Sequence, residues 1–338
     1  MQNQRNTLFK HLQLSVSNEQ LALKCLIQNF AFLSRMKVLQ KKLHLKSLLI
    51  YFKKKNQFFS ILLLLLPLFI VILQKTPAQS SGKTQNEKIF LPIVKGQKYS
   101  IELLSEWKSI EQGMDLQKIN LFNQTEEIET QLKLYKFDPA LFDIRVLCSK
   151  NYGKKRIDVK TIAKLSGTVA IINSSYFDAQ GSPLAYLRCN GKIVNSKVAS
   201  HSLYSGVFFM RHGRPYIVHA RRFNPKMDAS DVAQVGPRLI SKGKNTIGLK
   251  NINAVHHRSG IALDKKGNVI IYATNSQFGG ISWNILRYIL KLKKIGGFEV
   301  LNLDGGGSTQ MYISTKNHED YVRGLSPVPS AIAFFRKE

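Results

Sequence analysis

The segment LNLDGGGSTQ, residues 301–310, combines residue types that could carry chemistry. An apolar stretch leads into Asp304. The five residues that follow are Gly305, Gly306, Gly307, Ser308 and Thr309. Consecutive glycines allow positive φ and remove side chains, so peptide N–H groups can converge on an anion such as phosphate. An aspartate beside that site would repel phosphate, which indicates a chemical task for Asp304. The alternative is a tight turn that Asp304 caps.

Other motifs that bind phosphate or metal are absent from the sequence. GxxxxGK[ST] does not occur and no GxGxxG opens a helix, so a P-loop or a dinucleotide site lacks support. HExxH and DxDxDG are missing as well. The adjacent His256 and His257 would point to opposite faces of a strand, so we expect them to have structural or solvent roles. The sequence therefore predicts neither a cofactor nor an obligatory metal.

Short strands are expected to position the segment. TVAII at 168–172 is an apolar, β-branched run. GVFFM and RPYIV are separated by residues 211–213 and predict a compact hairpin. SGIAL and NVIIYA flank DKKG, where Gly267 stands at the position that needs positive φ. Residues 101–135 alternate charged and apolar residues without a clear period.

One helix is expected directly before the segment, within ISWNILRYILKLKKIGG at 281–297. Ile285, Ile289 and Leu292 fall on one stripe, Ser282 can cap the start, and Gly296 with Gly297 ends the helix. FEVLNL then forms a strand with Asp304 at its end. The predicted fold class is α+β: a mixed β-sheet core with packed helices, in a single catalytic domain behind an N-terminal membrane segment.

Four stretches, in order, make the chain resemble the phosphodiester glycosidases, a family also described in bacterial proteins associated with exopolysaccharide. A GxxL helix followed by NLDGGGS is similar to the C-terminal signature of that family. Three upstream stretches resemble further segments of the family in the expected order: INSSYFDAQGSPLAYLRCNGKIV, AQVGPRLI and HRSGIALDKKGNVI. The resemblance covers about residues 135–335. Ser174, Ser175, Ala185 and Phe298 depart from the smaller residues usual in the family, which affects substrate fit more than chemistry.

The resemblance implies hydrolysis of a sugar 1-phosphodiester between the anomeric carbon and the phosphate oxygen. A phosphate monoester has a second pKa near ~6, so it departs without much help from a general acid. A single carboxylate that activates water or stabilises the oxocarbenium ion is then enough, whereas ordinary glycosidases need a pair. Asp304 is the candidate for that carboxylate.

The same resemblance suggests further site residues. Arg258 would bind the phosphate through its planar fork, or else form a surface salt bridge. Asn173 would donate to phosphate or sugar hydroxyls, or simply end its strand. Asp178 would supply a second carboxylate, or form a turn before AQGSP. Gly236 would shape the backbone near the site, while the residues from Gly305 to Thr309 would hold the phosphate.

The charge of the chain is unusual, with 50 Lys and Arg against 21 Asp and Glu and a net charge of +29. Residues 1–57 form a basic leader, which we expect in the cytoplasm. Residues 58–73 carry no charge and span about 24 Å as a helix, so they are expected to be a transmembrane signal anchor or a signal-peptide core. Lysines before this run place the remainder outside the cytoplasm, membrane-anchored or secreted. Residues 74–100 read as a linker, and 101–338 as the catalytic domain.

Cys148 and Cys189 fall in the exported part, where a disulfide is permitted, and two unpaired thiols are the alternative.

The expected membrane topology explains much of the positive charge, so nucleic acid is not an expected partner. The predicted function is that of a hydrolase acting on a sugar-phosphate glycan of the envelope or extracellular space, such as an N-acetylglucosamine-1-phosphodiester. The alternative is a non-catalytic module that binds phosphate-bearing exopolysaccharide.

Overall fold

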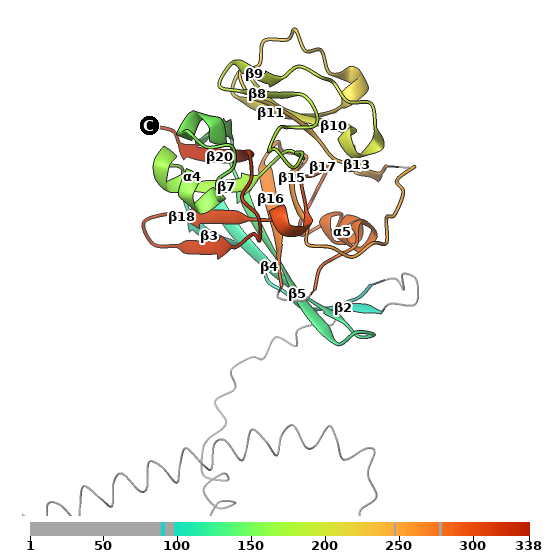
Figure 1. Ribbon diagram of the computed structural model, residues 1–338. Helices are drawn as coiled ribbons and strands as arrows, with labels where there is room; N and C mark the ends of the chain where they lie inside the picture. The colour runs from blue at the N-terminus through green and yellow to red at the C-terminus, as the bar shows by residue number, and fades with distance from the viewer. Residues whose placement is uncertain (1–88, 92–97, 247, 277–278) are drawn as a thin grey trace, which may run out of the picture. The chain divides into compact units, whose positions relative to one another are not determined.

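The computed structural model of the chain describes residues 89–91, 98–246, 248–276 and 279–338 (Figure 1). The predicted leader at residues 1–57 and the predicted membrane segment at 58–73 lie outside these residues, as does most of the predicted linker. Within the described part, none of the helices is both long and apolar enough to cross a bilayer.

The largest sheet in the described part has ten strands, and every pairing in it is antiparallel. The strand order is β1-β2-β4-β5-β16-β15-β17-β13-β14, with β3 paired to β4. The bounds are β1 Ile89–Phe90, β2 Tyr99–Leu104, β3 Lys108–Glu111, β4 Met114–Asn123, β5 Ile128–Phe137, β13 Arg238–Ser241, β14 Lys244–Asn245, β15 Ser259–Leu263, β16 Val269–Asn275 and β17 Glu299–Asn302.

Two further antiparallel sheets of five strands each complete the β-structure of the described residues. One has the order β11-β10-β12-β8-β9, the other β19-β18-β7-β20-β6. Their bounds are β6 Phe142–Cys148, β7 Ala170–Asn173, β8 Leu187–Cys189, β9 Lys192–Asn195, β10 Gly206–Arg211, β11 Arg214–His219, β12 Val232–Val235, β18 Met311–Ser314, β19 Glu319–Val322 and β20 Ser330–Arg336.

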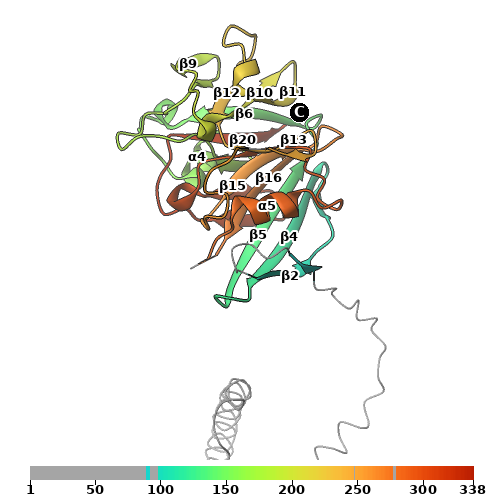
Figure 2. The same cartoon turned by 90° about the vertical axis from the view of Figure 1, so that its right-hand side faces the viewer.

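Two α-helices cover the sheets of the described part. The first, α4, spans Val159–Ser166, and the predicted helix α5 spans Trp283–Leu290. Ser282 caps α5 as expected, by accepting the N–H of Ile285. The short 3-10 helices are η1 Ser149–Tyr152, η2 Ser202–Tyr204, η3 Ala220–Arg222 and η4 Gly306–Ser308. The buried face of α5 packs on the ten-stranded sheet, and Figure 2 shows the helix from its outer side.

The expected α+β class with a mixed sheet is wrong, because the described chain is mostly antiparallel β-structure. Tight turns such as that between β10 and β11 join neighbouring strands, and such turns produce antiparallel pairs. The helix α5 does connect two strands that run in the same direction, β16 and β17. However, β15 lies between them and pairs antiparallel with both, so no parallel pair forms.

Residues 101–135, which showed no clear period, belong to a long antiparallel arrangement dominated by β4 and β5. The pattern is obscured because some polar side chains face inward. Lys133 is buried, and its Nζ lies 2.6 Å from Oδ1 of Asp320, whose Oδ2 accepts the hydroxyl of Tyr135. The partner comes from 187 positions away, so no local pattern predicts the burial.

The three sheets share one apolar core. Its buried side chains include Phe137 and Ile271 from the ten-stranded sheet, Phe208 from the β10 sheet, and Ile172 and Phe334 from the β7 sheet. Burying these large side chains supplies most of the favourable free energy of folding. The three sheets are therefore packed against one another through a common set of buried side chains.

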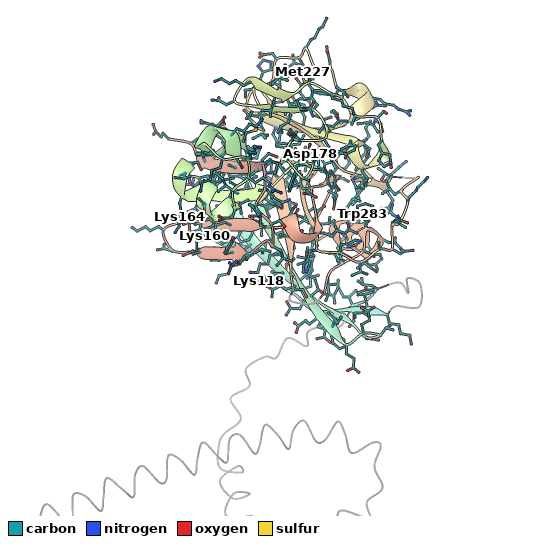
Figure 3. All side chains as sticks on the ribbon, viewed as in Figure 1. Lys118, Lys160, Lys164, Asp178, Met227 and Trp283 are labelled. Atoms are coloured by element: carbon teal, nitrogen blue, oxygen red, sulfur yellow. A yellow bond between two sulfur atoms is a disulfide. The ribbon has the colours of Figure 1, made fainter. Side chains whose placement is uncertain are left out.

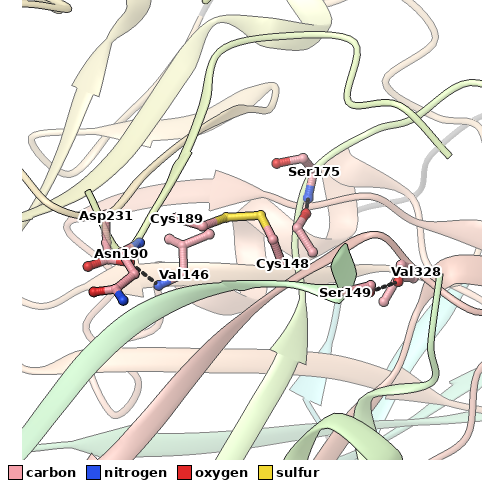
Figure 4. The surroundings of a disulfide bond; sticks show 9 residues. Val146, Cys148, Ser149, Ser175, Cys189, Asn190, Asp231 and Val328 are labelled. Atoms are coloured by element: carbon pink, nitrogen blue, oxygen red, sulfur yellow. Dashed lines mark hydrogen bonds between the residues drawn. A yellow bond between two sulfur atoms is a disulfide. The ribbon is translucent and has the colours of Figure 1, made fainter. Parts of the chain in front are cut away.

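A disulfide between Cys148 and Cys189 links the end of β6 to the end of β8 (Figure 4). Of the two alternatives for these cysteines, the bonded one is found. Nearby, the carboxylate of Asp231 accepts the N–H groups of Val146 and Asn190 at 2.8 and 3.2 Å. The bond thus ties two sheets together beside the shared core.

Candidate functional site

Three strand ends, one from each sheet, converge on the DGGGST segment. Asn173 ends β7, Gly236 follows β12, and Asp304 lies two residues after the end of β17. The N–H of Asp304 donates to the carbonyl of Ser174 at 3.0 Å, which joins the β17 end to the β7 end. The structure therefore brings together sequence positions that are more than 100 residues apart.

The carboxylate of Asp304 is largely enclosed. Burial raises its pKa to about 6, although the hydroxyl of Ser308 and the N–H of Gly305 both donate to it and act in the opposite direction. Removing water penalises the charged form more than these two donors compensate. An aspartate with a pKa near neutrality can change its protonation state during a reaction, which is a property of catalytic carboxylates.

The glycine loop differs from the anion nest that the sequence predicts. The N–H of Gly305 faces Asp304, and the N–H of Gly306 donates to the carbonyl of His257 at 2.9 Å. The N–H groups of Ser308 and Thr309 donate back to carbonyls of the loop. Most of the backbone donors therefore hold the loop in place, and phosphate binding by these residues stays a prediction.

Close packing explains why glycines occupy this loop. A Cβ added to Gly305 would lie 2.8 Å from the carbonyl oxygen of His257. Gly306 has φ of +58°, in the left-handed region that favours glycine. The hydroxyl of Thr309 is buried without a hydrogen-bond partner in the described part of the chain. The glycines thus allow the loop to lie directly against His257, which comes before Arg258 and the start of β15.

Asn173 holds both ends of the loop. Its fully buried carboxamide donates to the carbonyl of Asp304 at 2.7 Å and accepts the N–H of Gln310 at 3.1 Å. The hydroxyl of Ser259 donates to the same carbonyl of Asp304 at 2.8 Å. Asn173 therefore positions Asp304 through the backbone, while direct contact with a substrate stays a prediction.

Arg258 is a buried cation beside the loop, not a surface residue. Its Nε and Nη2 donate to the carbonyls of Ile281 and Ala254 at 3.2 and 2.7 Å, and its guanidinium lies 4.4 Å from the ring centre of Trp283. Burial lowers the pKa of Arg258 to about 10, and no ion pair joins it to a carboxylate in the described part. Among the described residues, no acceptor pairs with its Nη1 or with the second hydrogen of Nη2, so these hydrogens can be donated to an anion.

Tyr176, Tyr204 and Asn302 belong to the site although the sequence did not single them out. The Tyr176 hydroxyl donates to the carbonyl of Gly236 at 2.7 Å, and the Asn302 carboxamide donates to the same carbonyl at 3.1 Å. Burial and the charge of Asp304 raise the pKa of Tyr176, and the same causes in the same order raise that of Tyr204. The two rings meet edge to face with centroids 5.6 Å apart.

Gly236 shapes the backbone at this point. A Cβ there would lie 2.9 Å from the carbonyl oxygen of Leu203, so a side chain would displace the η2 turn that carries Tyr204. Tyr176 and Asn302, which both donate to the Gly236 carbonyl, lie in the quoted stretches INSSYFD and NLDGGGS, two or three positions from predicted site residues. Their motif positions were the available signal for them, but their roles depend on contacts across sheets.

Asp178 is held in a turn, and Figure 3 shows it apart from Trp283, which lies at the start of α5. Its Oδ1 accepts the N–H groups of Gln180 and Ser182 at 2.9 and 2.8 Å. This geometry is that of the turn-forming alternative, and a role as a second carboxylate stays a prediction. Among the described residues, no group of three or more His, Cys, Asp and Glu side chains is placed to hold a metal ion.

Comparison with known proteins relates the chain to one enzyme family and to solved structures of similar fold. The model of the phosphodiester glycosidase family matches residues 166–335. No curated protein sequence matches the chain. A hypothetical protein from Synechocystis has 15% identity and a TM-score of 0.53, and the match covers 70% of this chain but only 64% of that protein.

A second solved structure is the catalytic domain of zebrafish N-acetylglucosamine-1-phosphodiester alpha-N-acetylglucosaminidase, auto-inhibited by its pro-peptide. It is 14% identical to this chain, with a TM-score of 0.54, and the match covers 71% of this chain and 88% of that domain. At these identities the two structures show a shared fold.

Proposed function

The chain belongs to the phosphodiester glycosidase family, and from that premise we propose that it hydrolyses the bond between the anomeric carbon and the phosphate oxygen of a sugar 1-phosphodiester. An N-acetylglucosamine-1-phosphodiester is the model substrate, because the zebrafish enzyme of similar fold is named for it. The observations that carry the proposal are the enclosed carboxylate of Asp304 and the buried cation Arg258, whose charges both act on the hydroxyl of Tyr176.

The proposed step is balanced around these two groups. Water adds to the anomeric carbon as the bond to the phosphate oxygen breaks, and the bond electrons leave with the phosphate monoester. Asp304 in its ionised form takes the proton of the water or stabilises the oxocarbenium ion. Arg258 offsets the negative charge that grows on the departing phosphate. Tyr176 and Asn302 fix the backbone at Gly236, and Asn302 also donates to the carbonyl of Leu303, the residue before Asp304.

A pure receptor for phosphate gains nothing from an adjacent carboxylate, so the site favours the hydrolase over the binding module. We also propose that the natural target is an envelope or extracellular glycan. The apolar run at 58–73 would anchor or export the domain, which would then act outside the cytoplasm. The disulfide between Cys148 and Cys189 suits a compartment that permits such bonds.

Leaving-group selectivity tests the proposal. One carboxylate cannot both activate water and protonate a poor leaving group, so turnover should depend on the phosphate. We expect release of free N-acetylglucosamine from its α-1-(methyl phosphodiester) and no detectable release from methyl α-N-acetylglucosaminide. Hydrolysis of both at similar rates would mean that a general acid is present, and turnover of neither would remove the support for a hydrolase.

The pH dependence follows from Asp304. Both proposed roles need the ionised carboxylate, and its pKa is raised to about 6. We therefore expect kcat/KM for the methyl phosphodiester to rise about tenfold per pH unit below pH 6 and to level off above it. The measurement is the initial rate from pH 4 to pH 8 at constant ionic strength. A profile that is flat down to pH 4.5 would rule out Asp304 as the titrating group.

A further inference from the structure

A cavity of about 680 Å³ lies beside the candidate site. Tyr204 forms part of its wall, and the same ring packs on Tyr176, whose pKa rises with the charge of Asp304. Ser205, the residue after Tyr204, also lines it and accepts the N–H of Arg238. The cavity is therefore joined to the candidate site through the contact between Tyr204 and Tyr176.

Two histidines present fixed N–H donors in this cavity. The Nδ1 of His201 accepts the N–H of Leu203 at 3.2 Å, and the Nδ1 of His219 accepts the N–H of Arg221 at 3.1 Å. A neutral imidazole that accepts at Nδ1 carries its proton on Nε2. Burial and nearby arginines lower the pKa of His219, so it is a neutral donor at neutral pH. Both side chains suit an acceptor-rich ligand.

The lining of the cavity is positive. Arg221, Arg238 and Lys244 lie in its wall, and the described residues of the wall include no Asp or Glu. Arg238 is already paired with Glu299 at 2.8 Å. In the part of the chain that the structure describes, no ion pair involves Arg221 or Lys244. Uncompensated cations in a recess raise the local concentration of anions.

The positive lining continues beyond this cavity. Asn245 lines both it and a second cavity of about 380 Å³. Lys291 and Lys293, at the end of α5, line the second cavity and also a third of about 520 Å³. These three adjoining hollows are called the cationic groove below.

The far end of the groove adds Lys265, Lys266 and the ring of Trp107. The carboxylate there, Asp264, accepts the N–H groups of Lys266 and Asn268 and so holds its own turn. The half-exposed ring of Tyr288 lies in the middle hollow. Aromatic rings with cations along one recessed path suit sugar faces and acidic substituents together.

We propose that the cationic groove binds an extended anionic glycan of several sugar-phosphate repeats, with the bond to be cleaved at Asp304. This inference rests on the proposed function and narrows its substrate from a small phosphodiester to a polymer. Three hollows joined end to end accommodate a chain, and their uncompensated cations complement its repeating negative charge.

The test compares two substrates and two double variants. The substrates are a synthetic hexamer of α-1-phosphate-linked N-acetylglucosamine and the methyl phosphodiester of the single sugar. The groove variant is Lys291→Ala with Lys293→Ala. The control variant is Lys154→Ala with Lys155→Ala, which removes the same charge from exposed positions outside the groove. Binding of the hexamer to each protein in an Asp304→Asn background is measured separately by fluorescence anisotropy.

The groove variant should lose about three- to tenfold in kcat/KM and in affinity for the hexamer, while the monomer rate and the control variant stay unchanged. The difference in hexamer affinity between the groove variant and the wild type should shrink above 0.5 M salt, because the screening length is then only about 4 Å. Equal losses for monomer and hexamer, or for both variants, would overturn the proposal.

If hexamer binding requires the groove but no substrate is hydrolysed, the groove proposal stands and the proposed hydrolase activity does not. Groove-dependent binding to phosphatidylglycerol vesicles without hexamer binding would replace the glycan with a membrane surface.

Discussion

Replacing Asp304 with asparagine is expected to lower kcat for a sugar 1-phosphodiester by about 10³-fold with little change in KM. Asparagine keeps the size of the side chain and an oxygen that can accept from Ser308, but it cannot take a proton or stabilise a cation. The measurement is steady-state release of free sugar by the wild type and by Asp304→Asn at pH 7.5.

Thermal unfolding separates this effect from loss of the fold. The folded-state pKa of Asp304 is raised to about 6 from 3.8, so above pH 6 the wild type carries a buried charge that costs stability. The asparagine variant should therefore be at least as stable at pH 7.5, and the difference should vanish toward pH 4. Asp320→Asn is a matched control: it loses the ion pair with the buried Lys133, so stability should fall while kcat is kept. Loss of kcat only in proportion to lost folded protein would argue against a chemical role for Asp304.

Replacing Arg258 with methionine is expected to reduce kcat/KM by about 10²-fold or more, because one charge-stabilising donor at a reacting group typically contributes that much. Stability should change little. The guanidinium is buried without a carboxylate partner, so removing it relieves a desolvation cost while two backbone carbonyls lose their donor. Steady-state rates and the melting temperature are measured on the same samples.

Arg287→Met provides the control for this variant. Arg287 is also buried, donates to the carbonyl of Thr246, and has a pKa lowered by burial, but it lies on α5 away from the DGGGST loop. We expect its rate for the small phosphodiester to match the wild type. Equal losses of activity in the two variants would show that Arg258 acts only by supporting the fold.

Local patterns in the sequence predicted the elements that local physics determines. The β10–β11 hairpin follows from two apolar runs around a glycine turn, and the start of α5 follows from Ser282 as its cap. The position of Asp304 at a strand end followed from FEVLNL in the same way. Each of these features depends on residues that are neighbours in the sequence, so the sequence was enough to predict it.

The sheet arrangement and much of the site depend on distant contacts, so they could not be predicted. Insertion of β15 between β16 and β17 makes the sheet antiparallel, and nothing within any one strand encodes that insertion. The sequence placed Asn173 at a strand end, but the bridge that its carboxamide forms between Asp304 and Gln310, more than 130 positions away, exists only in the folded chain. Likewise, the N–H of Gly306 donates to the carbonyl of His257, and these two groups come together only when the chain folds.

The position of bond cleavage tests the central claim most directly. Hydrolysis of the N-acetylglucosamine α-1-(methyl phosphodiester) in ¹⁸O-labelled water, followed by mass spectrometry of both products, reports which atom the water attacks. A glycosidase places the label in the free sugar and leaves the methyl phosphate unlabelled, and this is the expected result. Label in the phosphate would show attack at phosphorus and contradict the account.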